Sequence, residues 1–266
     1  MSCPLPGYSH EIHIASLWRT CYNKDEQKPK YRQLSPAHRW IHMEYQRHAY
    51  PFSKSLPMLL SLSAVGGICA GYGVICCGHI FACGLTGNLI GTWRELLSGN
   101  PINGLLRILG IVLFVTGIAA AALIPEKLQG CKTRLRWEQL SIIVLLLCLT
   151  FIMLIPEGWN DLLRAAPVFF FAAVQYHSFT EFEGVTASTI FCSNNFRQLT
   201  LSLLGWKRKG QLSERHRAKI YSLMIAAYSL GIIYVCLAAE PLGKRMFLPA
   251  VLLYLLLIPC VSGESR

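Results

Sequence analysis

The chain contains 266 residues, of which 53% are hydrophobic and only 15% are charged. Soluble domains carry about a quarter charged residues, so this composition excludes an ordinary soluble domain and indicates a membrane protein. The formal net charge of +11 does not point to nucleic acid, because the basic residues are distributed as membrane topology requires.

The first 56 residues form a predicted cytoplasmic basic tail. The segment NKDEQKPKYRQ is polar and interrupted by proline, which favours disorder. The segment SPAHRWIHMEYQRH starts with Ser35 before Pro36 and mixes aromatic and basic residues. This pattern predicts a short interfacial helix on the anionic leaflet. His38 and His42 lie one helical turn apart, but without a third ligand they predict no metal site.

Six apolar segments approach the roughly 20 residues that a helix needs to cross a bilayer. They are residues 57–83, 105–124, 140–155, 165–182, 220–239 and 246–261. We therefore predict an all-α polytopic membrane protein with six transmembrane helices. A first three-helix repeat would occupy residues 57–155, and a second would occupy residues 156–266.

The basic residues alternate between the two sides of these segments. Twenty of the 25 Lys and Arg lie in the tail, in alternate loops and at the C-terminus, while the other side holds only Arg94, Arg107, Arg164, Lys244 and Arg245. Because cytoplasmic loops are enriched in basic residues, both termini are predicted to be cytoplasmic.

Two polar triplets interrupt the apolar pattern. Thr86, Gly87 and Asn88 follow the first segment, and an apolar stripe at helical spacing then runs to the helix stop SGNP. The feature returns 107 residues later at Ser193, Asn194 and Asn195. We interpret each triplet as the start of a short broken half-helix. Three spans per unit make the two units inverted repeats, which recur in secondary transporters beside a substrate path.

Two longer motifs resemble a known family. GGICAGYGVICCGHIFACGLTGNLIG and VQYHSFTEFEGVTASTIFCSNNFRQL resemble the two halves of the YoaK-like membrane proteins, the domain of unknown function 1275. The resemblance covers residues 45–261 and implies a six-helix protein of the bacterial inner membrane. Ala70 stands where that family carries an acidic residue, which weakens a proton-coupling hypothesis. The family begins near residue 43, so the preceding residues are interpreted as an extension or as an incorrect start.

Candidate substrate-binding residues come from the triplets and from the fourth segment. Thr86, Asn88, Ser193 and Asn195 are predicted to cap their own helices, with anion contact as a second role at positive helix ends. Gln175 and Ser178 share a face of the most polar span, and Arg197 could neutralise an anionic solute or a lipid phosphate. The nine candidates are Thr86, Gly87, Asn88, Gln175, Ser178, Ser193, Asn194, Asn195 and Arg197.

Other patterns favour structural roles. Small residues spaced four apart at Ser63, Gly67 and Gly71 indicate close helix packing, within the chain or in a homo-oligomer. Cys69, Cys76, His79 and Cys83 share one predicted helix face, but we interpret them as core residues and expect no metal and no cofactor. His177 and Glu181 could pair one turn apart.

Two functions remain open at this point. The first is a small-solute transporter with a site between the first and fourth helices, supported by the inverted repeat. The second is a non-transporting membrane scaffold or lipid-interaction protein, supported by the basic tail and the small-residue spacing. Enzyme motifs such as a nucleophile elbow or a P-loop are missing from the sequence, so we expect no catalysis. The expected partners are the lipid bilayer and an unknown small solute, and no nucleic acid.

Overall fold

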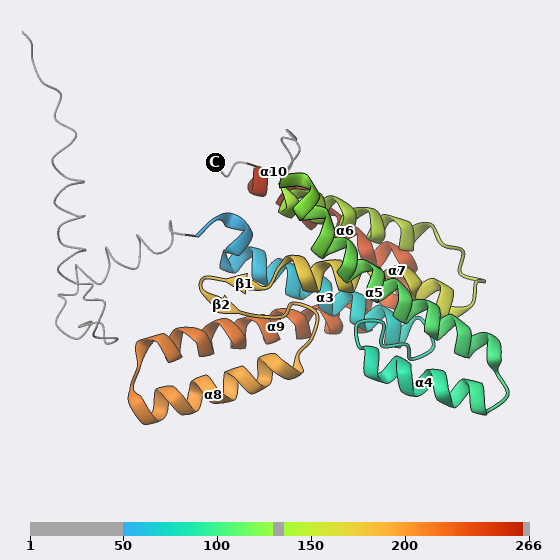
Figure 1. Ribbon diagram of the computed structural model, residues 1–266, viewed down its shortest axis with the longest axis horizontal. Coiled ribbons are helices and arrows are strands. Elements are labelled where there is room, and N and C mark those ends of the chain that lie inside the picture. Colours follow the sequence, from blue (N-terminus) through green and yellow to red (C-terminus); the bar gives the residue numbers. More distant parts are fainter. Residues whose placement is uncertain (1–49, 130–135, 263–266) are drawn as a thin grey trace, which may run out of the picture. The chain divides into compact units, whose positions relative to one another are not determined.

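The computed structural model describes residues 50–129 and 136–262 (Figure 1). Six of the described helices lie at the six predicted apolar segments: α3 (Leu56–Ile75), α5 (Pro101–Gln129), α6 (Trp137–Leu154), α7 (Asp161–Ser178), α9 (Leu212–Leu242) and α10 (Leu248–Ser262). The shorter helices α4 (Leu85–Leu97) and α8 (Ser193–Lys209) follow the breaks after α3 and α7. The 3-10 helices η2 (Phe52–Lys54) and η3 (Gly243–Phe247) and the antiparallel strands β1 (Glu181–Phe182) and β2 (Val185–Thr186) complete the described part.

Several helices are long and apolar enough to cross a membrane. Among the described residues, such stretches are Leu56–Ile75, Pro101–Leu128, Trp137–Leu154 and the 50-residue stretch Leu212–Val261, which contains both α9 and α10. The helix α7 carries more polar residues, but most of its apolar side chains are buried inside the bundle. The protein is therefore helical, with the apolar helices of a multi-pass membrane protein.

The helices pack in a regular set of pairs. The helix α3 lies along α9, and α7 lies along α5. Each short helix packs on the long helix that follows it, α4 on α5 and α8 on α9, while α6 contacts both α7 and α10. The main core lies between these pairs and is mostly aliphatic and aromatic.

Glycines set the distance between α3 and α9. A Cβ added at Gly67 would collide with the backbone carbonyl of Tyr228, and one added at Gly231 would collide with that of Ala64. On another side of α3, Gly66 meets the carbonyl of Thr189. The packing role predicted for the small residues of the first segment is confirmed. Because the chain's own backbone covers these glycines, they do not offer the homo-oligomeric contact that the sequence suggested.

We predicted that the first apolar segment forms one long helix. This prediction is wrong, because α3 ends at Ile75. Gly78 and His79 both take positive φ values of 59°, which turn the chain back toward α3. The amide of Ile80 then donates to the carbonyl of Gly73 at 2.9 Å. Ile80 and Cys83 are buried in this loop, and their apolar character led to the incorrect prediction of a continuous helix.

The fourth segment also ends earlier than predicted. The helix α7 stops at Ser178, and the β1–β2 hairpin follows instead of further helix. Glu183 and Gly184 form its two-residue turn with φ values of 46° and 74°. Two successive positive φ angles are typical of the type I′ turn, which matches the twist of a hairpin.

The predicted interfacial helix after Ser35 and the histidines within it lie outside the described residues. The division into two three-helix repeats remains a prediction.

Candidate functional site

Gln175 occupies the centre of the bundle and is completely buried. Its amide nitrogen donates to the Leu62 carbonyl and to the Thr189 hydroxyl, both at 2.9 Å. Its amide oxygen accepts a hydrogen bond of 2.6 Å from the Tyr254 hydroxyl. One side chain of α7 thus connects α3, the loop before α8, and α10. Because a polar side chain buried among apolar residues is costly unless paired, this network fixes the relative position of all four segments.

Asn88 lies in the first turn of α4 and is also buried. Its amide nitrogen donates to the carbonyls of Phe81 and Gly84, both at 2.8 Å. Its oxygen accepts from the guanidinium of Arg107 on α5 at 3.3 Å. The side chain therefore closes the loop that leads into α4 and connects this loop to α5.

Asn195 makes the corresponding contacts in the second half. Its amide nitrogen donates to the carbonyls of Ser188 and Phe191 at 2.7 and 2.6 Å, again seven and four residues upstream. Its oxygen accepts from the amide of Ser188 at 3.3 Å.

The predicted capping role of these residues is therefore wrong. Neither α4 nor α8 has a side-chain hydrogen bond from its N-cap residue, Gly84 or Cys192. Asn88 and Asn195 bind the carbonyls of the preceding loops, where they replace backbone partners that a continuous helix would have supplied. The sequence identified the two residues. It did not show that their side chains bind the loop before each helix instead of the helix's own amides.

The other candidates from the triplets have exposed side chains. Thr86 and Gly87 on α4, and Ser193, Asn194 and Arg197 on α8, are all exposed. Ser178 is half-buried and its hydroxyl lies 3.1 Å from that of Ser141 on α6. Three of the nine predicted residues are thus buried and hold the fold, Ser178 is half-buried on α7, and the other five are exposed in the first turns of the short helices.

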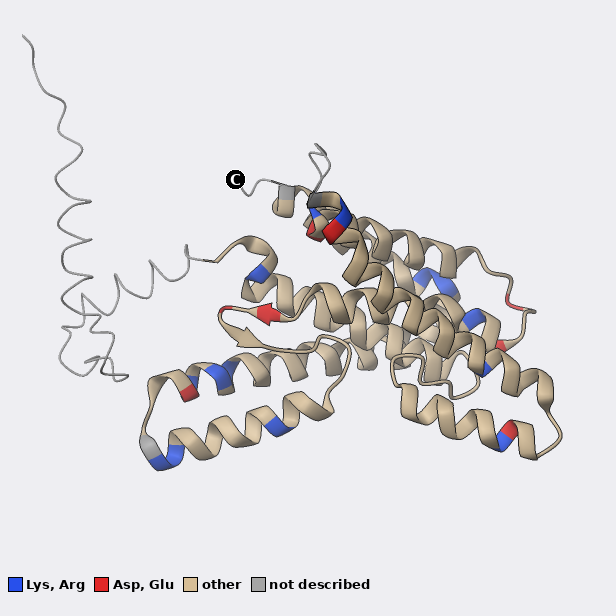
Figure 2. Ribbon diagram, in the orientation of Figure 1, with Lys and Arg blue, Asp and Glu red and all other residues tan. Residues whose placement is uncertain are grey.

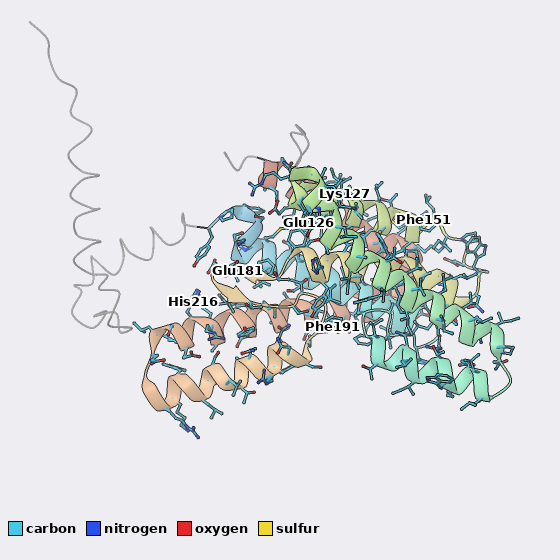
Figure 3. All side chains as sticks on the ribbon, viewed as in Figure 1. Glu126, Lys127, Phe151, Glu181, Phe191 and His216 are labelled. Atoms are coloured by element: carbon cyan, nitrogen blue, oxygen red, sulfur yellow. The ribbon has the colours of Figure 1, made fainter. Side chains whose placement is uncertain are left out.

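The two short helices begin at the middle of the bundle and run toward opposite ends (Figure 1). In the loops that precede α8 and α4, the Thr189 carbonyl lies against Gly66 near the middle of α3, and the Ile80 carbonyl lies against Gly73. Phe191, from the loop before α8, packs edge-on against Tyr176 of α7 with centroids 5.0 Å apart, and lies 6.5 Å from Phe114 of α5 (Figure 3). The loops before α8 and α4 are therefore both held against α3.

Sequence reasoning missed several polar residues of this region. Tyr254 and Thr189 complete the network around Gln175, but both lie in segments that looked purely apolar or irregular. Arg107 is mostly buried between α4 and α5 although it falls inside an apolar segment. A charged residue within a predicted span was the available signal. Nearby on α4, a hydrogen bond from Arg94 lowers the pKa of the Glu95 carboxyl.

The acidic residues near the end of α7 pair differently from our prediction. The carboxylate of Glu181 lies 2.7 Å from the ammonium of Lys54, so it does not pair with His177. Glu183 instead accepts from the amide of Leu56 at 3.2 Å and lies 3.6 Å from His216 of α9. Figure 3 shows Glu181 and His216 at the same end of the bundle. Because α7 ends at Ser178 and Glu181 lies in β1, His177 and Glu181 are not one helical turn apart, which explains the difference.

The proposed stripe of soft ligands does not form either. Because α3 ends at Ile75, Cys76, His79 and Cys83 lie in a loop and do not continue the helix face of Cys69. Residues 50–129 and 136–262 contain no group of three or more His, Cys, Asp or Glu placed to hold a metal.

Two grooves were found on the described surface. One, of about 400 Å³, is apolar and lies between α5, α6 and α7; its lining includes Leu113, Cys148, Phe151 and Phe170. The other, of about 260 Å³, lies between α8 and α9 and includes Gln198, Glu214 and Arg217. None of the nine predicted site residues lines either groove.

These features define a class, a multi-pass helical membrane protein with two interrupted segments and a buried polar centre. Residues 58–259 match the family model described as "Protein of unknown function (DUF1275)". Because the match covers most of the chain, the protein belongs to this family, and the resemblance noted in its motifs is confirmed. No curated protein and no solved structure matches the chain significantly.

Proposed function

We propose that the protein is a small-solute transporter built from two inverted three-helix repeats, residues 57–155 and 156–266. The observation that carries the proposal is the repeated asparagine arrangement. Asn88 and Asn195 bind carbonyls at the same two upstream positions, before helices that run in opposite directions. Interrupted segments related in this way are typical of secondary transporters, where they lie beside the substrate path.

The helix contacts support the inverted relation. In an inverted repeat, α3 would correspond to α7 and α9 would correspond to α5. The equivalent of the contact between α3 and α9 is then the contact between α7 and α5, and both contacts are present. The close contacts agree as well. Gly231 of α9 meets the Ala64 carbonyl of α3, and an added Cβ at Gly117 of α5 would lie 3.0 Å from the Phe170 carbonyl of α7.

In this proposal, the network around Gln175 is the central element of the transport path. Its hydrogen bonds join segments from both repeats, so a movement of one repeat against the other must break some of them. A solute with hydrogen-bond donors and acceptors can replace the lost partners. The conformation in which the repeats have moved then has a lower free energy when solute is present. The present arrangement then corresponds to a closed state, in which the protein's own groups pair with one another.

The test is flux into liposomes that contain the purified full-length protein. A panel of labelled small anions, cations and neutral solutes is compared with empty liposomes. We expect uptake of at least one solute, and a large decrease in Gln175→Ala. The matched control is Ser229→Ala, because Ser229 is an exposed α9 residue whose hydroxyl donates only to the Ile225 carbonyl of its own helix.

The transporter proposal fails if no solute in the panel enters above the rate of empty liposomes. It also fails if Gln175→Ala, shown to be folded by gel filtration and circular dichroism, transports at the wild-type rate. A control variant that lost flux to the same extent would show that the assay reports stability instead of transport.

The apolar groove favours a second function, a non-transporting scaffold or lipid-interaction protein. The groove between α5, α6 and α7 is lined almost entirely by apolar atoms and includes the exposed side chain of Phe151, as expected for an acyl chain site. This function predicts that Leu147→Trp, which fills the groove, changes the lipids that co-purify with the protein. Triplet substitutions would leave them unchanged.

The cellular setting belongs to the same proposal. We place the protein in the bacterial inner membrane with both termini in the cytoplasm. The basic residues near the junction of α8 and α9 support this orientation (Figure 2), because cytoplasmic ends are enriched in Lys and Arg. No catalytic role is part of the proposal, and any homo-oligomer would use surfaces other than the buried glycines of α3.

A further inference from the structure

The groove between α8 and α9 is polar and lies beside the turn that joins these helices. Its volume is about 260 Å³. The α8 residues that line it, Gln198, Leu201, Ser202 and Gly205, recur at helical spacing and share one face. Because Gly205 has no side chain, Glu214 of α9 lies close to the α8 backbone, and a Cβ added at Gly205 would be 3.2 Å from the Glu214 Cγ.

Several polar groups of this groove have no partner within residues 50–129 and 136–262. Ser202 is only 1% exposed, yet its hydroxyl makes no hydrogen bond to these residues, and the amide of half-buried Gln198 makes none either. The Arg217 guanidinium of α9 lies 3.7 Å from the Glu214 carboxylate, which is longer than a charge-assisted hydrogen bond. Its donors therefore remain available. Because buried polar groups are normally paired, these side chains indicate an outside partner.

The turn between α8 and α9 is strongly basic. Residues 207–219 contain six Lys or Arg and one Glu. Four of the basic side chains are exposed and lie more than 4 Å from every carboxylate of the described segments: Lys207, Arg208, Arg215 and Lys219. Figure 2 shows the basic residues gathered at this end of the two helices. The positive charge around the groove favours an anionic ligand.

Apolar side chains of α8 are exposed along the same region. They are Leu201, Leu203, Leu204 and Trp206. The Arg215 guanidinium lies 5.7 Å from the centre of the Trp206 ring, and tryptophan is enriched where lipid headgroups meet hydrocarbon. The apolar segment of α9 starts at Ile220, three residues after Arg217. The groove is therefore placed at the depth at which a phospholipid presents its phosphate.

We propose that this groove binds the phosphate headgroup of an anionic phospholipid. Arg217 supplies the positive charge, Ser202 and Gln198 donate hydrogen bonds to phosphate oxygens, and the acyl chains lie along the exposed leucines of α8. A free phosphate would use the same donors but not the leucines, so the apolar side chains favour the lipid. The site shares no residue with the apolar groove between α5, α6 and α7, and it does not depend on transport.

Native mass spectrometry of the full-length protein in detergent micelles measures the binding of the first added lipid molecule. The protein is titrated with phosphatidylglycerol and, separately, with phosphatidylcholine that has the same acyl chains and a headgroup without net charge. We expect phosphatidylglycerol to bind about tenfold more tightly. Millimolar glycerol 3-phosphate, which has the phosphate but no chains, should not displace the lipid.

Two matched pairs of variants assign the binding to the groove. Arg217→Gln should weaken phosphatidylglycerol binding about tenfold. Its control is Lys219→Gln, which removes the same charge from an exposed α9 residue outside the groove and should weaken binding only about twofold. Ser202→Ala should weaken binding about threefold. Thr200→Ala should have no effect, because this exposed α8 hydroxyl donates to the Phe196 carbonyl of its own helix.

Glu214→Gln distinguishes a lipid site from a merely structural ion pair. The substitution removes the negative charge from the groove, so phosphatidylglycerol should bind about threefold more tightly. If the pair of Glu214 and Arg217 served only to hold the helices together, the same variant would bind the lipid more weakly. The melting temperature of each variant in detergent shows that it is folded before binding is compared.

Three results would overturn the headgroup site. The first is equal affinity for phosphatidylglycerol and phosphatidylcholine. The second is an equal loss in Arg217→Gln and Lys219→Gln, which would assign the binding to the general positive charge of the turn. The third is displacement of the lipid by glycerol 3-phosphate, which would make a soluble phosphate the ligand. Since none of these measurements involves flux, they leave the transporter proposal to its own liposome test.

Discussion

Substitution of Gly67 by alanine tests whether backbone contact between α3 and α9 holds the fold together. The new Cβ would lie 3.0 Å from the Tyr228 carbonyl carbon and 3.2 Å from the Ile232 amide nitrogen, and closer still to the Tyr228 oxygen. These atoms belong to a helix backbone and cannot rotate away, so the two helices must separate. Overpacking of a close contact costs about 1 to 3 kcal/mol, and a rigid backbone neighbour places this site near the upper value.

The helix propensity of alanine acts in the opposite direction. Alanine is favoured over glycine in a helix by about 1 kcal/mol. The expected net loss of stability for Gly67→Ala is therefore about 2 kcal/mol. Gly87→Ala is the matched control, because nothing lies within 4 Å of the added Cβ. In that variant only the propensity gain remains, so we expect it to be about 1 kcal/mol more stable than the wild type.

Unfolding by sodium dodecyl sulfate in mixed micelles, followed by tryptophan fluorescence, measures both variants. The two alanine substitutions should differ by roughly 3 kcal/mol, with opposite signs relative to the wild type. If Gly67→Ala were as stable as Gly87→Ala, the α3–α9 contact would not be held by its backbone atoms, and the arrangement of these helices would be wrong.

Four further substitutions test the polar groups of the interior. Asn88→Ala and Asn195→Ala each leave two loop carbonyls without their donor, so we expect each to lose about 2 to 4 kcal/mol in the same detergent titration; unequal losses, with one near zero, would contradict equivalent roles in the two halves. Tyr254→Phe removes the donor to the Gln175 oxygen and should cost about 1 to 2 kcal/mol. Tyr234→Phe removes a hydroxyl from a half-buried tyrosine that donates to the Met246 carbonyl, and it should cost less. A larger loss in Tyr234→Phe than in Tyr254→Phe would show that the Gln175 network is not stabilising.

The sequence was sufficient to locate the helices and the starts of α4 and α8, but not the ends of α3 and α7. Apolar runs of adequate length place α5, α6, α9 and α10 because lipid-facing and core-facing positions are both apolar. The same rule fails after Ile75, where Ile80 and Cys83 are apolar because they fill a buried loop. Hydrophobicity records burial and does not distinguish a buried turn from a helix. Gly78 beside His79 was a local sign of the turn, since glycine readily takes a positive φ.

The site was predictable only where a single residue departs from its surroundings. Gln175 was identified as a polar residue deep in an apolar segment, and it proved to be the centre of a network. Its partners could not be found in the same way, because Leu62 contributes a carbonyl and Tyr254 is 79 residues away. Thr189 escaped notice because it lies in an irregular loop, and only the packing brings its hydroxyl to the Gln175 amide.

The glycine contacts between α3 and α9 have a mechanical consequence. Helices usually interlock through ridges of side chains, which must climb over one another before the helices can shift lengthwise. Around Gly67 and Gly231, backbone faces backbone, so this stretch has no side chains to interlock. Here the two helices resist being pushed together but oppose axial displacement only weakly. The pair is therefore suited to shear, a motion of small sliding steps between packed helices, instead of hinge bending.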